Sequence, residues 1–261
     1  MKISIITVVK NDKNNIEKTI RSVAIQNHKN KEHIIIDGNS SDGTSDIIRK
    51  YSKKLKYFRQ SDLGIYDAIN KGIKKTNGDI VCLLHSGDIF SNNGILEIIN
   101  ELFKKNYKIV SGNVLFYDDK KKLNITRTWN KKIQFLDPKF FFLIPHTTLF
   151  IDKKIITKIE PYSLKYKISS DADFTIRLSK LKVRYIHLNK YIIYMKNGGI
   201  STDLSYLLTK IIEDLKILCN HFKFEFFLIY IKKIFSKTPG LLPQNRNILQ
   251  KIVKKQLKKI F

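Results

Sequence analysis

The 261-residue sequence is short of cysteine and of acidic residues, and it contains no long apolar run. Its two cysteines, Cys82 and Cys219, lie far apart and have no further Cys or His at metal-binding spacing. This excludes a disulfide framework and a cysteine-based zinc site. Such sparse use of cysteine is typical of a reducing compartment.

No stretch reaches the roughly 18 apolar residues that a membrane-spanning helix needs. The longest candidate, residues 140–151, is interrupted by Pro145 and His146. The apolar run at residues 3–9 is too short for a secretory signal. We therefore expect a cytoplasmic protein, associated peripherally with the inner face of a membrane.

Acidic residues number 23 against 49 lysines and arginines, which gives a formal net charge of +26. A background composition rich in Lys, Asn and Ile could produce this surplus, but the resulting field still attracts phosphate or anionic lipid. Nucleic acid is not an expected partner, because the basic residues are dispersed and no known nucleic-acid-binding signature is present.

Apolar residues make up 43% of the chain, enough for a buried core. Up to residue 104, short β-branched runs alternate with segments of helical spacing. The expected strands are residues 3–9, 33–37, 57–58 and 80–84, and the expected helices are residues 14–26, 44–51, 65–75 and 91–104. This alternation predicts an α/β fold with a mostly parallel, Rossmann-like sheet covered by helices on both faces.

After residue 108 the pattern changes. Residues 109–116 and 125–129 read as strands with no helix between them, followed by a helix at 171–181 and a strand at 183–188. We expect these to extend the same sheet, so that residues 1–203 form one domain. Residues 204–261 read as basic amphipathic helices, which could lie on an anionic leaflet, pack on the domain, or join a second subunit in a homodimer.

Polar residues follow several of the expected strands, where ligands of parallel sheets bind. Asn11 and Asp12 follow the first strand, and Asp37 comes directly after three isoleucines, a costly position unless the acid is paired or functional. The glycine-containing segment 38–44 could cradle an anion, or it could be an ordinary turn and helix cap.

Five blocks in this order resemble the family 2 inverting glycosyltransferases, in their bacterial surface-polysaccharide branch with an Asn-Ser-Gly-Asp-type metal motif. The blocks are SIITVVKN at 4–11, TIRSV at 19–23, IDGNSSDGT at 36–44, DLGIYDAINKG at 62–72 and LHSGD at 84–88. The resemblance covers residues 3–203. It implies a GT-A nucleotide-diphospho-sugar transferase fold. It also implies transfer of a sugar from a UDP-sugar to a glycan or lipid-linked acceptor, with inversion, in cell-surface polysaccharide or lipopolysaccharide synthesis.

The resemblance also assigns donor-binding positions by alignment of these blocks. Those positions are Thr7, Val9, Asn11, Asp37, Asp67, Asn70, Lys71 and Ser86. Asp88 would hold a divalent cofactor, Mg²⁺ or Mn²⁺, against the diphosphate, because a hard cation neutralises the charge of the leaving nucleotide.

Two residues depart from the pattern of this branch. Ser86 stands where the Asp-x-Asp form has its first acid, so metal binding would rest on Asp88, waters and phosphates. His85 replaces the usual Asn and could be a metal ligand or merely hydrogen-bonded. The Ser86 departure leaves open an alternative function, a catalytically silent scaffold at the membrane surface.

The second catalytic block is residues 168–177, where the resemblance implies a general base at the start of a helix. We expect Asp171 to take the proton of the acceptor hydroxyl and Asp173 to bind or support the acceptor. Alternatively, both acids merely stabilise a helix N-terminus.

Three further features could contribute to the site. His146 lies in a block like the family's His-Gln-x-x-Phe and would sit near the acceptor or the diphosphate, or be structural. Residues 197–202 resemble a loop that closes over the donor phosphates, although an ordinary turn would look the same. Trp129 and Tyr66 could stack on a sugar ring or belong to the core.

Overall fold

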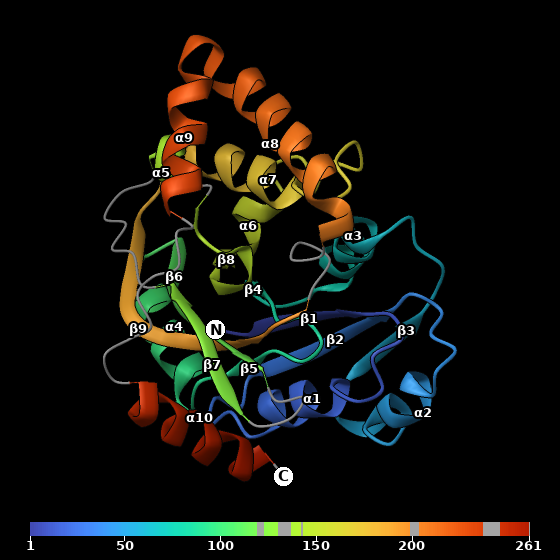
Figure 1. Ribbon diagram of the computed structural model, residues 1–261. Helices are drawn as coiled ribbons and strands as arrows, with labels where there is room; N and C mark the ends of the chain where they lie inside the picture. Colours follow the sequence, from blue (N-terminus) through green and yellow to red (C-terminus); the bar gives the residue numbers. More distant parts are fainter. Residues whose placement is uncertain (119–122, 130–136, 142, 199–203, 237–245, 261) are drawn as a thin grey trace.

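The computed structural model describes residues 1–118, 123–129, 137–141, 143–198, 204–236 and 246–260. Their strands are β1 Ile3–Val9, β2 Lys31–Asp37, β3 Lys56–Arg59, β4 Ile80–Leu83, β5 Ile89–Phe90, β6 Ile109–Asp118, β7 Asn124–Trp129, β8 Phe150–Asp152 and β9 Tyr185–Lys196. They form one sheet in the order β3-β2-β1-β4-β8-β6-β9-β5, and β7 pairs with β6 (Figure 1).

Helices pack around this sheet. They are α1 Ile16–Ala24, α2 Thr44–Arg49, α3 Ile65–Lys75, α4 Ile95–Lys104, α5 Pro138–Phe141, α6 Lys153–Ile156, α7 Ser170–Ser179, α8 Leu207–Phe222, α9 Phe226–Ser236 and α10 Arg246–Ile260. Short 3-10 helices occur at η1 Ser52–Lys54, η2 His146–Thr148, η4 Leu204–Tyr206 and η5 Lys223–Glu225. The α/β class is confirmed.

The sheet is mixed rather than mostly parallel. Strands β3, β2, β1 and β4 are parallel neighbours, as the alternating sequence predicts. Beyond them, β8 runs antiparallel to both β4 and β6, while β6 and β9 are parallel. Strand β7 also runs antiparallel to β6, because a short connection without a crossover helix joins antiparallel strands.

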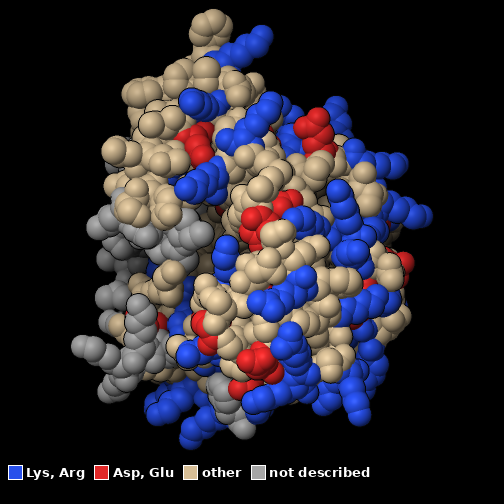
Figure 2. Space-filling model, turned by 90° about the vertical axis from the view of Figure 1, so that its right-hand side faces the viewer, with Lys and Arg blue, Asp and Glu red and all other residues tan. Residues whose placement is uncertain are grey.

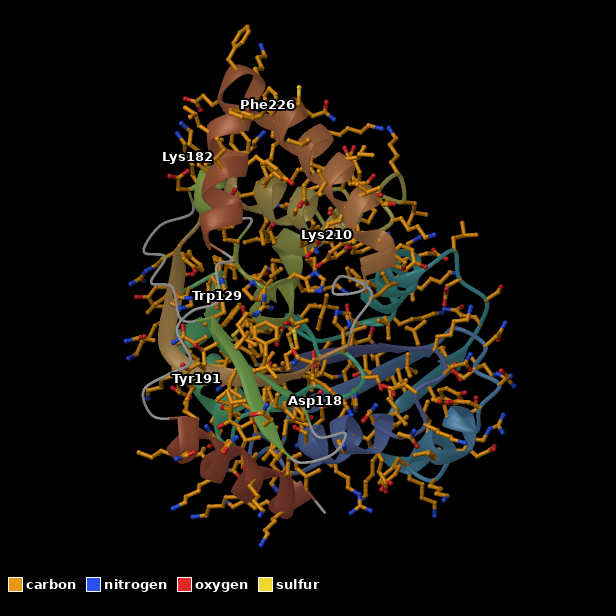
Figure 3. All side chains as sticks on the ribbon, viewed as in Figure 1. Asp118, Trp129, Lys182, Tyr191, Lys210 and Phe226 are labelled. Atoms are coloured by element: carbon orange, nitrogen blue, oxygen red, sulfur yellow. The ribbon has the colours of Figure 1, made fainter. Side chains whose placement is uncertain are left out.

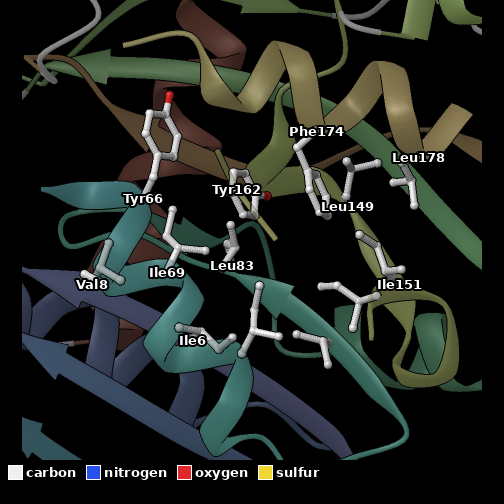
Figure 4. Packing of buried hydrophobic residues seen from close by; sticks show 14 of the residues in the cluster. Ile6, Val8, Tyr66, Ile69, Leu83, Leu149, Ile151, Tyr162, Phe174 and Leu178 are labelled. Atoms are coloured by element: carbon white, nitrogen blue, oxygen red, sulfur yellow. The ribbon is translucent and has the colours of Figure 1, made fainter. Parts of the chain in front are cut away.

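The apolar run of β1 is buried along its whole length because helices cover both faces of the sheet. Successive side chains of a strand point to opposite faces. Ile6 and Val8 therefore pack against Tyr66 and Ile69 of α3 on one face (Figure 4), whereas Ile5 belongs to a cluster on the other face with α4.

Most boundaries differ from the sequence-based expectation by about two residues or fewer, and two differ by more. Helix α4 begins at Ile95, not at residue 91, because the preceding residues form the two-residue strand β5 and a turn. Strand β9 continues to Lys196, well past residue 188, because it pairs with β6 and then with β5. The expected turn at 118–122 falls mostly outside the described residues.

The C-terminal helices divide between two ends of the molecule (Figure 1). Ile217 and Leu218 of α8 pack with Ile176 of α7. Helix α10 instead lies against β7 and α1, where Val253 and Ile260 join another apolar cluster. The two ends therefore cannot serve as one continuous surface, although the division of the chain at residue 203 stays a prediction.

Basic side chains are spread widely over the surface. On the face that Figure 1 shows at its right, lysines and arginines are scattered with few acids between them (Figure 2). No described helix is both long and apolar enough to cross a membrane. On this face the charge is therefore diffuse rather than gathered in a single stripe.

Candidate active site

Three polar segments meet at the carboxyl edge of the parallel strands. Asp37 ends β2, Asn11 and Asp12 follow β1, and residues 84–88 follow β4. Because β2, β1 and β4 are parallel neighbours, these segments lie at the same edge of the sheet. The structure thus brings together the residues that the sequence places at strand ends.

Asp37 is fully buried and shapes the turn that follows it. Its Oδ1 accepts a hydrogen bond from the backbone N–H of Ser40 at 2.8 Å, and its Oδ2 accepts from the hydroxyls of Ser45 and Tyr57, each at 2.7 Å. Burial alone raises the pKa of Asp37, but these hydrogen bonds outweigh it and leave the pKa below its ordinary value. An ionised Asp37 therefore fixes the conformation of residues 38–44.

The side chains of Thr7 and Val9 are buried within the protein. The Thr7 hydroxyl donates to the carbonyl oxygen of Leu84 at 2.7 Å and lies 2.8 Å from Nε2 of His33. Val9 packs among the apolar side chains of α1 and α2. Thr7 and Val9, both predicted to contact the nucleotide sugar, are thus packed inside the protein, where they stabilise the ends of the strands.

Asn11 is exposed and has a left-handed backbone conformation, with φ of 53°. Its backbone N–H donates to the Ser40 hydroxyl at 2.8 Å, and its Oδ1 accepts from the backbone N–H of Ser41 at 2.8 Å. Asn tolerates this conformation better than most residues do. Asn11 thereby joins the turn after β1 to the turn after β2.

Asp88 lies beneath the end of β9 and is 3% exposed. Its Oδ1 accepts the backbone N–H of Lys196 at 3.0 Å. Two residues earlier, the Ser86 hydroxyl donates to Oδ2 of Asp12 at 2.7 Å. Burial raises the pKa of Asp88 to about 8, and the charge of Asp12 adds to the rise.

The oxygen atoms of this corner fit a hard divalent cation. A buried carboxyl with a raised pKa needs a proton or a cation to balance its charge, and Asp12 places a second carboxylate nearby. The described residues include no group of three or more His, Cys, Asp or Glu side chains that could hold a metal by themselves. Phosphate oxygens would therefore have to supply further ligands.

The three predicted site residues of α3 bond to one another or to nearby segments of the same chain. Asp67 accepts from the backbone N–H of Leu63 at 3.0 Å and pairs with Nζ of Lys71 at 2.7 Å. Asn70 bonds both backbone polar groups of Tyr162, at 2.8 and 2.9 Å. Asn70 thus fastens α3 to the segment that precedes α7.

Asp171 lies in the first turn of α7 and keeps 43% of its side chain exposed. The Tyr66 hydroxyl, from α3, has a single hydrogen: it lies 2.6 Å from the carbonyl oxygen of Ile168, its nearer acceptor, and 3.2 Å from Oδ1 of Asp171. Nδ1 of His146 lies 3.8 Å from Oδ2 of Asp171. Tyr66 and His146 therefore flank an accessible carboxylate.

His146 connects Asp171 to the turn that carries Asp88. Nε2 of His146 lies 2.9 Å from Nε2 of His85, which stands three residues before Asp88. The ring of His85 is thus engaged with His146. The two catalytic blocks of the sequence meet through this histidine pair.

Asp173 has a different environment from Asp171. Its Oδ2 accepts from Nε of Arg177 at 2.9 Å, and its Oδ1 lies 2.9 Å from Nε2 of His221 in α8. Burial acts to raise the pKa of Asp173, but the contacts with His221 and Arg177 prevail and lower it. Asp173 therefore ties α7 to α8, and these contacts favour a supporting role.

Glu213 of α8 was not singled out from the sequence. Its carboxylate is almost fully buried and accepts the backbone N–H groups of Lys167, Ile168 and Ser169, at 2.7 to 2.9 Å. These residues lead into α7, so Glu213 helps to set the position of Asp171. Neither its charge pattern nor its spacing signals this contact.

Of the remaining features that the sequence predicts for the site, the two aromatic residues pack against other side chains, and the loop is largely not described. Tyr66 stacks on Tyr162, with ring centroids 5.7 Å apart, and Trp129 contacts the edge of His187. The expected phosphate-covering loop at 197–202 lies mostly outside the described residues. Trp129 is only partly buried, and Figure 3 shows where it lies on β7.

Comparisons with known proteins agree with this arrangement. The sequence profile of Glycosyl transferase family 2 matches residues 4–160, more than half of the chain and ending before Asp171. An uncharacterised glycosyltransferase of Mycobacterium tuberculosis is 28% identical over 180 residues, covering 67% of this chain and 68% of the relative. A PGL/p-HBAD biosynthesis glycosyltransferase of Mycobacterium bovis is 26% identical over 190 residues, with 70% and 72% covered.

Solved structures share the fold. TarS of S. aureus in complex with UDP has a TM-score of 0.66 at 18% identity, over 90% of this chain and 71% of that one. A mannosyltransferase from Pyrobaculum calidifontis, in complex with GDP-Man and Mn²⁺, has a TM-score of 0.63 at 12% identity, over 99% and 74%. The GT-A fold is thereby confirmed. Profile, relatives and fold agree that the chain belongs to glycosyl transferase family 2.

Proposed function

We propose that this glycosyltransferase moves a sugar from a UDP-sugar to a hydroxyl group with inversion at the anomeric carbon. One observation carries the proposal. The accessible carboxylate of Asp171 is linked through His146 and His85 to the turn that holds Asp88. A proton acceptor and a diphosphate-binding corner at one edge of the sheet are what a single displacement requires.

The proposed reaction is one concerted step. The acceptor oxygen attacks the anomeric carbon, and the bond from that carbon to the diphosphate oxygen breaks. The nucleoside diphosphate leaves with the electrons of that bond. The proton of the acceptor hydroxyl passes to Asp171, and attack opposite the leaving group inverts the configuration.

The chain's own residues would prepare this step. Tyr66 and His146 would orient the Asp171 carboxylate, and Asp173 would support α7 through Arg177. Asp88, with Asp12 beside it, would hold the Mg²⁺ or Mn²⁺ ion. Such an ion, when bound, offsets the negative charge that develops on the leaving diphosphate.

Donor recognition is proposed for the turns after β1 and β2. Asp37, which is fully buried, would act on the nucleotide through the turn at residues 38–44 that it holds, and Asn11 and Ser86 would lie along the nucleotide. Asp67, Asn70 and Lys71 on α3 would border the sugar. The choice of UDP follows the sequence resemblance and the UDP-bound TarS structure.

The proposed acceptor is a glycan or a lipid-linked glycan of the cell surface. The named mycobacterial relative acts in PGL/p-HBAD biosynthesis, and the lipopolysaccharide pathway belongs to the same proposal by resemblance only. A lipid-linked acceptor would approach from a membrane, which places the protein at the inner leaflet.

The hairpin of α8, η5 and α9 is the proposed membrane contact. Phe224, Phe227 and Leu228 near its turn are 96%, 58% and 64% exposed, and Lys216 of α8 and Lys223 of the turn are exposed as well. Exposed aromatic side chains flanked by lysines suit an anionic lipid surface. The hairpin packs on α7, so this contact would bring the lipid close to Asp171.

A panel of nucleotide sugars tests the function directly. With Mn²⁺ present, we expect at least one UDP-sugar to raise the melting temperature, since ligand at a hundred times its Kd stabilises the folded state by about 2.7 kcal/mol. That donor should also release UDP when an acceptor is added. Binding without UDP release, or no binding of any nucleotide sugar, would reject the proposed transfer and favour the silent scaffold.

A further inference from the structure

His85 and His146 form a partly buried pair whose Nδ1 atoms have no hydrogen-bond partner. Their Nε2 atoms are 2.9 Å apart, and the rings meet edge to face at 5.2 Å. The Nδ1 atoms of both rings are buried and lack a hydrogen-bond partner. Buried polar atoms without a hydrogen-bond partner are rare in proteins, so these two nitrogens call for a structural or functional explanation.

A hydrogen bond between two ring nitrogens needs one N–H and one lone pair. Burial lowers the pKa of both histidines, that of His85 to about 3, so both rings are neutral at pH 7. Two arrangements remain. Either His85 donates from Nε2 and His146 carries its proton on Nδ1, or His146 donates from Nε2 and its Nδ1 is a lone pair.

Asp171 decides between these arrangements. Its Oδ2 lies 3.8 Å from Nδ1 of His146, too far for a hydrogen bond but close enough for a strong electrostatic effect. A lone pair on Nδ1 would face the carboxylate charge and be repelled. An N–H on Nδ1 is attracted, so the carboxylate favours the arrangement in which His85 is the donor.

We propose that His85 is a positioning residue, which fixes His146 as the Nδ1–H tautomer so that His146 directs this N–H at the carboxylate of Asp171. This inference rests on the proposed role of Asp171 as the base. The Tyr66 hydroxyl lies 3.2 Å from the other oxygen of this carboxylate, Oδ1. His85 acts on the reaction only through His146.

Nitrogen NMR of the full chain tests the tautomers without any substrate. In protein labelled with ¹⁵N-histidine, we expect the Nε2–H tautomer for His85 and the Nδ1–H tautomer for His146 at pH 7. Single substitutions assign the signals, and His85→Phe should change the tautomer balance of His146. A proton on Nε2 of His146, or a charged ring, would overturn the proposal.

Matched amide variants test the effect on turnover. The amide nitrogen of Asn stands near the place of Nδ1 in histidine, and that of Gln near the place of Nε2. His146→Asn should therefore retain about tenfold more kcat than His146→Gln, and His85→Gln should retain more than His85→Asn. The donor KM should stay within about twofold in all four variants.

Equal losses within each matched pair would contradict the proposal, because a purely structural role does not distinguish the two amides. Melting temperatures show whether each variant is folded. If the wild-type protein transfers no sugar, the proposed function fails, yet the NMR measurement still decides whether His85 sets the tautomer of His146. The two failures are thus distinguishable.

Discussion

The Ser86 hydroxyl donates a hydrogen bond to the carboxylate of Asp12 over 2.7 Å, and it thereby joins the turn after β4 to the turn after β1. By the sequence resemblance, Ser86 would stand where an Asp-x-Asp motif has its first acid. The turn after β1 brings another acid, Asp12, to this place. In the proposed metal site, Asp12 would take the place of the missing carboxylate beside Asp88.

Metal dependence is the first prediction from this arrangement. Transfer should require Mg²⁺ or Mn²⁺ and stop in excess chelator. Asp88→Asn should lower kcat by about a hundredfold or more, and Asp12→Asn should raise the Mn²⁺ concentration needed for half-maximal rate. The measurement is a metal titration of UDP release.

Asp46→Asn is the control, because Asp46 is exposed and pairs only with Arg49 at the surface of α2 in the contacts described. It should leave the titration unchanged. Full activity of wild-type protein in excess chelator would remove both Asp88 and Asp12 from their proposed roles.

Glu32 should make stability depend on pH. Burial acts to raise its pKa, but hydrogen bonds from Ser4, Lys56, Asn77 and Lys2 lower it to about 2. A depressed pKa gives stability that is present above the unfolded value of 4.5 and lost as pH falls through 2. Glu32→Gln should therefore cost on the order of 3 kcal/mol at pH 7.

Urea unfolding at several pH values measures this effect. The difference between wild type and Glu32→Gln should shrink as pH falls from about 5 toward 3. Glu101→Gln is the control, since Glu101 is exposed and should change little. A difference that grows in acid would contradict the assigned charge of Glu32.

Glu213 should fix the conformation of residues 167–169, which lead into α7. Glu213→Ala leaves three buried backbone N–H groups without their acceptor, and we expect a loss of at least about 2 kcal/mol in unfolding free energy. The kcat should fall as well, because Asp171 follows these residues directly. Urea unfolding and UDP release measure the two effects.

An unchanged kcat in a folded Glu213→Ala protein would show that α7 keeps its position without this carboxylate. Glu225→Ala provides the comparison, because Glu225 pairs with Lys139 at the surface. That variant should unfold like the wild type.

Membrane contact should depend on the hairpin and not on α10. Replacing Phe224, Phe227 and Leu228 by serine should weaken binding to anionic vesicles by about tenfold or more, since apolar burial is lost. Ile248→Ser with Ile252→Ser, on α10 at the opposite end, is the matched control. Vesicle sedimentation measures both.

The opposite ranking, with α10 needed and the hairpin dispensable, would contradict the proposed orientation. Phe226, labelled in Figure 3, marks the start of α9 in the hairpin. Binding should also weaken with salt if the neighbouring lysines contribute.

The first half of the fold could be predicted because its strands are long β-branched runs separated by helices with a clear apolar face. The second half could not be predicted in detail. Strands β5 and β8 have two and three residues, too few to show a period. Their pairing with β9, β4 and β6 depends on partners distant in sequence.

The same distinction holds in the site, between residues that stand out in the sequence and contacts that do not. Asp37, Asp88 and Asp171 stand out locally, because each follows an apolar run or opens a helix. Asp12 meets Ser86 across 74 positions, and Glu213 meets Ile168 across 45. Contacts at such separations leave no pattern in one sequence.

The central claim is that Asp171 takes the acceptor proton in a single displacement beside the Asp88 turn. Asp171→Asn, compared with wild type in UDP release from the donor that binds best, tests this claim most directly. The kcat of this variant should be lower by about a thousandfold, with the donor-induced rise in melting temperature retained. Turnover close to that of the wild type would contradict this claim.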